Sequence, residues 1–164
     1  MAYQEFLRDF EETIRSAAAR LSEISADEGN VDGWSRREIL GHLIDSAANN
    51  HQRFVRAQFT DDLVFPGYEQ EEWVSAQRYN DEPWPNLIEL WRAYNLHLLH
   101  VVSRIPVDVL TQERLKHSLD QIAFKTIDQN APATLEYLIR DYVDHLKHHL
   151  DQIWRNAWHT PTNN

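Results

Sequence analysis

Apolar residues recur every three or four positions in four long segments of the chain, and charged or polar residues fill the positions between them. This spacing places apolar side chains on one face of an α-helix and leaves the opposite face for solvent. We therefore expect four amphipathic helices. They cover residues 3–24, from Ser35 to about Phe59, from Pro85 or Asn86 to just before Pro106, and from Pro132 or Thr134 to about Trp158.

The apolar faces of these helices predict a shared core. Ser35 and Glu38 form a capping box that starts the second helix, because each side chain can bond the other's backbone amide. The second helix faces inward with Leu40, Leu43, Ala47, Phe54 and Val55. The third helix does so with Leu87, Leu90, Trp91, Tyr94, Leu98 and Val101, and the last with Leu135, Leu138, Tyr142, Leu146, Leu150 and Ile153.

Two connectors separate the later helices. The segment 60–85 should contain a short helix from about Gln70 to Arg78, and the segment 106–133 one helical turn near Val107–Leu110. The tail 159–164 has no helical pattern. Long connectors often cover functional sites. The sequence thus predicts one all-α domain over residues 1–164, a four-helix bundle with short extra helices in its connectors.

Composition and charge exclude several classes of function. The 164 residues carry a formal charge of −10, which argues against a nucleic-acid partner, since such binding needs a basic surface. The chain has no cysteine, so it has no disulfide, no thiolate ligand and no thiol nucleophile of its own. Charges interrupt its first twelve residues, and no run of about 18 apolar residues occurs. We therefore expect a cytoplasmic protein without a membrane partner.

Candidate chemistry is concentrated in the stretch DYVDHLKHHLDQI at residues 141–153. On a helix, His145 and His149 lie one turn apart on one face, where two imidazoles can converge on a metal ion. His42 in the second helix is the candidate for a third ligand. The alternative is that His145 and His149 pack at a helix border with one nitrogen in water. His148 competes with His145 for the ligand role, since a three-residue spacing also shares a face.

Polar side chains accompany the candidate ligands. Ser46, Asn49 and Arg53 follow His42 along one edge of its helix, and Asn49 and Arg53 are candidates for contact with a polar or anionic ligand. Asp45, Asp141 and Gln152 are candidates for fixing the orientation of an imidazole. For each of these side chains, simple solvent exposure is the alternative. We expect His51 at the surface or at an interface. His97 and His100 should pack between helices, with a place at the pocket rim as the alternative. His117 lies in a connector and His159 in the tail.

The second helix carries its histidine in the stretch WSRREILGHLIDSAANNHQRF, and the last helix carries DYVDHLKHHLDQI. In this order and in a four-helix setting, the two stretches resemble the DinB-like (DinB/YfiT) superfamily over the whole chain. The resemblance implies up-down-down-up connectivity and a divalent metal, often zinc or nickel, held by His42, His145 and His149. It also implies frequent homodimers. The superfamily includes thiol S-transferases that use bacillithiol or mycothiol, a thiol-dependent maleylpyruvate isomerase and members without a known activity.

A site of three imidazoles keeps a fourth position open for water or a thiol, as catalytic rather than structural sites do. Thiol transfer or conjugation on a small molecule, with a low-molecular-weight thiol as cosubstrate, is therefore the first hypothesis. Metal-dependent hydrolysis is the second. The third is a metal-binding or interaction module without turnover. A pocket beside the open position would favour an enzyme, and a fourth ligand from Asp141 or His148 would favour the module.

Overall fold

Four long helices make up the core of the computed structural model, which describes residues 1–27 and 33–156. They are α1 (Tyr3–Glu23), α2 (Arg36–Arg56), α4 (Trp84–Ser103) and α7 (Leu135–Asn156). The predicted helices are confirmed to within a few residues at the ends that the structure describes. The expected end of the last helix at Trp158 and the tail 159–164 lie outside the described residues.

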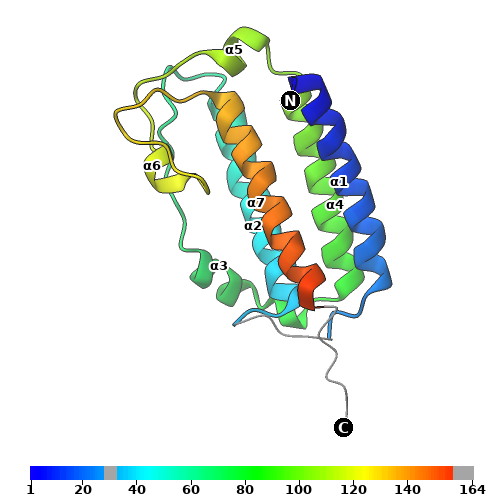
Figure 1. The fold of residues 1–164 in the computed structure, drawn as a ribbon. Helices are drawn as coiled ribbons and strands as arrows, with labels where there is room; N and C mark the ends of the chain where they lie inside the picture. The colour runs from blue at the N-terminus through cyan, green and yellow to red at the C-terminus, as the bar shows by residue number, and fades with distance from the viewer. Residues whose placement is uncertain (28–32, 157–164) are drawn as a thin grey trace.

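The long helices have the predicted connectivity. In Figure 1, α1 and α7 run in one direction, and α2 and α4 run in the other, so the order is up-down-down-up. Because α2 and α4 are parallel, the chain must return along the length of the bundle between them. The connector with α3 (Gln70–Gln77) makes this return (Figure 1). It is therefore held beside the bundle instead of forming a tight turn.

The predicted core is largely confirmed, with corrections on two helices. All six inward positions predicted for the last helix are buried. Leu90 in α4 was assigned inward but is 45% exposed, and Ile88 is buried in its place. Val55, Tyr94 and Val101 are only half-buried. The buried face of α4 is therefore rotated by part of a turn from the predicted apolar face. It includes Asn95, which a pattern of apolar residues leaves out because its side chain is polar.

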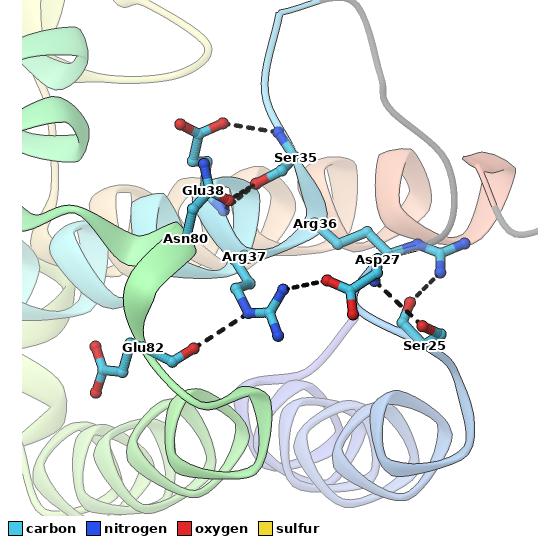
Figure 2. Close-up of polar contacts among 8 residues, drawn as sticks. All are labelled: Ser25, Asp27, Ser35, Arg36, Arg37, Glu38, Asn80 and Glu82. Atoms are coloured by element: carbon cyan, nitrogen blue, oxygen red, sulfur yellow. Dashed lines mark hydrogen bonds and ion pairs between the residues drawn. The ribbon is translucent and has the colours of Figure 1, made fainter.

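The first turn of α2 is fixed by a dense set of polar contacts (Figure 2). The capping box is present: the Glu38 amide donates to Ser35 Oγ at 3.1 Å, and the Ser35 amide donates to Glu38 Oε2 at 2.8 Å. Arg37 forms an ion pair with Asp27 at 2.6 Å and donates to the Glu82 carbonyl. Arg36 donates to the Ser25 carbonyl. These contacts set the register of α2 two turns before its histidine.

Three short helices besides α3 lie in the connectors: η1 (Tyr79–Asp81), α5 (Val107–Thr111) and α6 (Leu119–Ile122). The predicted helices in 70–78 and near 107–110 are confirmed, whereas η1 and α6 were not expected. The two connectors join each other, because the Leu63 amide donates to the Lys116 carbonyl and the Ser118 amide donates to the Leu63 carbonyl. Within the described residues, no helix is long and apolar enough to cross a membrane.

Candidate metal centre

His42, His145 and His149 come together between α2 and α7 and are named the histidine triad here. One nitrogen from each lies within 4.8 Å of the others. His42 Nε2 and His145 Nε2 are 3.3 Å apart. Tetrahedral coordination at metal–nitrogen distances of about 2.0–2.1 Å would separate two ligand nitrogens by about 3.3 Å. One pair therefore already has the separation of metal ligands, and the third nitrogen is close to it.

A close approach beside His42 explains the glycine before it. The ring of Tyr79, in η1, packs directly on Gly41 in α2, and a Cβ at Gly41 would lie 2.1 Å from that ring. Tyr79 OH reaches Asp45 one turn later and donates to its Oδ1 at 2.6 Å. The connector is thus fastened to α2 on both sides of His42. The Trp34 ring packs against the His42 imidazole, with centroids 5.0 Å apart.

Burial keeps the triad in the neutral form that binds metals. Desolvation, followed by the proximity of His149, lowers the pKa of His42 to about 3. Desolvation and the neighbouring imidazoles lower the pKa of His145 to about 3 as well. The pKa of His149 is also lowered, mainly by burial. At neutral pH all three imidazoles offer a lone pair, so the donor set suits a divalent ion.

Gln152 contacts one imidazole of the triad by a hydrogen bond. Its Oε1 lies 2.8 Å from His149 Nδ1, so the ring donates there and leaves Nε2 for the cluster. Ser46 Oγ lies 3.5 Å from His145 Nδ1, at the limit of a hydrogen bond. His42 Nδ1 is buried and has no hydrogen-bond partner among the described residues. Only part of the triad is therefore oriented by neighbouring side chains.

The two acidic candidates, Asp45 and Asp141, bind residues of the connectors. Within the described residues, neither forms a hydrogen bond to an imidazole of the triad. Asp45 accepts hydrogen bonds from Tyr79 OH and from Gln77 Nε2, the latter at 2.7 Å. Asp141 accepts from the backbone amides of Phe124 and Lys125, both at 2.7 Å. Burial raises the pKa of both carboxyl groups, and these hydrogen bonds oppose that shift. Their contribution to the site is to position the connector walls.

An open pocket of about 400 Å³ adjoins the triad. Side chains from α2 and α7 and from both connectors line it: Ser46, Asn50, Arg53, Tyr68, Gln70, Gln121, Ile122, Ala123, Phe124, Tyr142, His145, His148 and His149. Arg53 is therefore on the pocket wall. Asn49 does not line this pocket; its side chain donates to the Asp45 carbonyl in its own helix.

Several lining residues could not be identified from sequence. Phe124 packs against the His145 ring at a centroid distance of 5.4 Å, and Tyr68 comes from the other connector. Connector side chains follow no period, so spacing gave no signal for them. Asn50 is different: it lies on α2 one turn after Ser46, and reading that edge with both three- and four-residue steps would have included it.

The remaining histidines do not join the triad. His148 is exposed at the pocket rim, and its Nε2 lies 3.4 Å from Gln152 Nε2. His117 is buried in the second connector, where Nε2 donates to the Ala131 carbonyl at 2.7 Å. His97 and His100 are exposed on α4, and His51 is half-buried against Tyr94. His159 lies outside the described residues. His97 and His100 were expected between helices, so their exposure corrects that expectation.

Fold and site together define a four-helix bundle with three converging imidazoles at an open pocket. Neither models of protein families nor curated protein sequences give a significant match to the chain. Solved structures do. YfiT from Bacillus subtilis, described as a probable metal-dependent hydrolase with an unusual four-helix bundle topology, superposes with a TM-score of 0.72 and 16% identity. The match covers 96% of this chain and 89% of YfiT.

A second solved structure with this fold is the mycothiol-dependent maleylpyruvate isomerase. Its TM-score is 0.65 at 15% identity, and the match covers 92% of this chain but 60% of the isomerase. The four-helix bundle that the resemblance implied is therefore confirmed as a fold.

Proposed function

We propose that this protein is a metal-dependent enzyme acting on small molecules, with His42, His145 and His149 as the ligands of a divalent ion. The convergence of three imidazole nitrogens within 4.8 Å, at a pocket of about 400 Å³, carries the proposal. Imidazole ligands suit zinc and nickel among other ions, and these two are the metals we propose. When bound, the ion supplies a Lewis acid that lowers the pKa of a water or thiol beside it.

The surroundings of the triad favour an enzyme over a closed metal site. Neither candidate for a fourth ligand occupies that role in the described chain: Asp141 is bonded to backbone amides, and His148 is exposed at the rim. Phe124 and the other connector residues form pocket walls beside the triad. Three protein ligands with an accessible fourth position are the arrangement of catalytic zinc sites.

Thiol transfer or conjugation is our first choice of reaction and hydrolysis our second. A chain without cysteine must receive any thiol from a cosubstrate, and the pocket has room for one beside the triad. Of the two proteins with this fold, one is described as mycothiol-dependent and the other as a probable metal-dependent hydrolase. A cytoplasmic location and a homodimer remain predictions.

The test is elemental analysis of untagged protein purified without chelator, for wild type and His42→Ala. We expect about one divalent ion per chain in the wild type, and loss of that ion in the variant with helicity retained. The metal-loaded protein is then assayed with low-molecular-weight thiols plus electrophiles, and with esters and amides. If reconstitution with zinc, nickel or manganese gives no bound ion, the histidines are packing residues and the protein is an interaction module.

A further inference from the structure

Arg53 is a buried cation in the wall of the pocket beside the histidine triad. Its side chain is on α2, and the residue is only 6% exposed. The guanidinium donates to the Pro66 carbonyl at 3.1 Å and to Asn50 Oδ1 at 3.4 Å. Both acceptors are neutral. A buried charge that meets only neutral partners is costly unless something else compensates it.

No carboxylate of the described chain compensates Arg53. None of the ion pairs among the described residues includes Arg53. The described residues that line the pocket include no Asp, Glu or Lys, so Arg53 is the permanent charge on that wall. The acidic group that acts on the charge of Arg53 is the Tyr68 phenol. Burial raises the pKa of Tyr68 to about 12, so the phenol is neutral at pH 7.

A continuous row of polar side chains leads from Arg53 to the triad. Asn50, which accepts from Arg53, donates to the Ser46 carbonyl at 2.9 Å. Ser46 Oγ in turn lies 3.5 Å from His145 Nδ1. Seven residues separate Ser46 from Arg53, a rise of about 10 Å along the helix, and helical side chains lean toward the N-terminus. The guanidinium thus reaches from the far end of the pocket toward the triad.

We propose that the pocket binds a small-molecule carboxylate, with the acid group paired to Arg53 and the reacting end of the molecule at the histidine triad. Tyr68 and Asn50 supply neutral hydrogen-bonding groups beside that acid. A carboxylate matches the single cation and the planar fork of arginine. A phosphate monoester carries a charge of about −1.5 to −2, which exceeds the single positive charge of Arg53. This assignment rests on the proposed function, because the triad end is taken as the metal centre.

The first experiment measures ligand binding with the full chain loaded with cobalt, whose absorption changes when a thiolate binds. The probes are ω-mercaptoalkanoates of increasing length, each compared with its uncharged amide. We expect the wild type to prefer the acid to the amide by about tenfold or more at the best length, the effect of one buried charge-assisted pair. Arg53→Gln should reduce the ratio to near one. Arg56→Gln, at an exposed arginine one turn away, should keep the wild-type ratio.

A second measurement does not depend on the metal. Calorimetric titration of the metal-free protein with hexanoate and hexanamide should show binding of the acid only, and loss of that binding in Arg53→Gln. Tyr68→Phe gives a further test if Arg53→Gln does not fold, and we expect it to weaken acid binding by a few fold.

The outcomes separate the carboxylate site from the metal centre. Equal affinity of wild type for acid and amide overturns the carboxylate assignment while cobalt binding upholds the triad. An acid preference that persists in Arg53→Gln also overturns it, since the metal itself would then hold the carboxylate. Hexanoate binding through Arg53 in a protein that binds no metal supports the carboxylate site and refutes the proposed function.

Discussion

Helix α2 contributes a histidine to each of two groups, and the two differ in almost every respect that matters for chemistry. The histidine triad joins His42 to two residues of α7. The second group, named the α2–α4 histidines here, consists of His51, His97 and His100. Ring centroids are separated by 4.5–5.2 Å in the triad and by 5.2 and 6.4 Å along the α2–α4 group. Ring proximity alone therefore does not distinguish them clearly.

Burial and the direction of the nitrogens distinguish the groups. His42 is completely buried, and the triad nitrogens converge at a pocket. His97 and His100 are exposed, and His51 Nδ1 is taken up by Tyr94 OH at 3.0 Å. Among the described residues, the triad is the group of histidine and acidic side chains whose donor atoms meet closely enough for an ion. Helical spacing thus brings imidazoles together in both groups. The triad becomes a candidate metal site because its third imidazole comes from a buried position on the facing helix.

The largest expected difference between the groups is stabilisation by zinc. At a free zinc concentration a thousand times its dissociation constant, binding should stabilise the wild type by about 4 kcal/mol. For a domain of this size that raises the melting temperature by about 10 °C. His145→Ala should abolish the shift, and the matched variant His97→Ala should keep it. Thermal unfolding with and without zinc measures both. Equal loss in the two variants would mean that zinc acts through the α2–α4 histidines too.

Because the triad is buried, the metal-free protein should lose stability as the pH falls. The pKa of His42 is about 3 in the folded chain and about 6.5 when unfolded. Between these values the unfolded chain binds the proton, so stability present above pH 6.5 is lost as the pH falls toward 3. At pH 5 the loss from His42 is about 2 kcal/mol. Denaturant unfolding at several pH values should show a flatter profile for His42→Gln. Identical profiles would show that His42 is protonated while folded.

Neighbouring hydrogen bonds provide a smaller contrast between the groups. Gln152 Oε1 lies 2.8 Å from His149 Nδ1, and Tyr94 OH lies 3.0 Å from His51 Nδ1. Gln152→Leu should lower zinc affinity about tenfold, because the His149 ring loses the acceptor that fixes its tautomer. Tyr94→Phe removes the corresponding contact in the other group and should leave the affinity unchanged. Competition with a chromogenic chelator measures both constants. If Gln152→Leu left the zinc affinity unchanged, Gln152 would have no role in orienting His149.

The sequence predicted the four helices, their direction through the resemblance, and the three histidines that the structure brings together. These features depend on periodic patterns within single helices, which sequence records directly. The error at Leu90 arose because α4 buries the polar residue Asn95, whose side chain accepts a hydrogen bond from Tyr142 OH at 2.5 Å. A stripe drawn through apolar residues alone is rotated away from such a position.

The pocket walls could not be predicted, since they depend on contacts between distant segments. We expected Asp141 to orient an imidazole, but it accepts hydrogen bonds from the amides of Phe124 and Lys125 and so holds Phe124 edge-on beside His145. The helical position of Asp141 was visible in the sequence, but the loop that would reach it was not. The same holds for Asp45, whose partners Gln77 and Tyr79 come from the first connector.

The smallest effect is expected at His148, the neighbour of a triad member in sequence. It lies on α7 between His145 and His149, but its side chain is exposed and contacts Phe124 at a ring distance of 5.2 Å. His148→Ala should leave metal content unchanged and alter stability by no more than about 0.5 kcal/mol, as exposed substitutions do. Elemental analysis and denaturant unfolding measure the two effects. A large loss of metal would instead make His148 a ligand in place of its competitor His145.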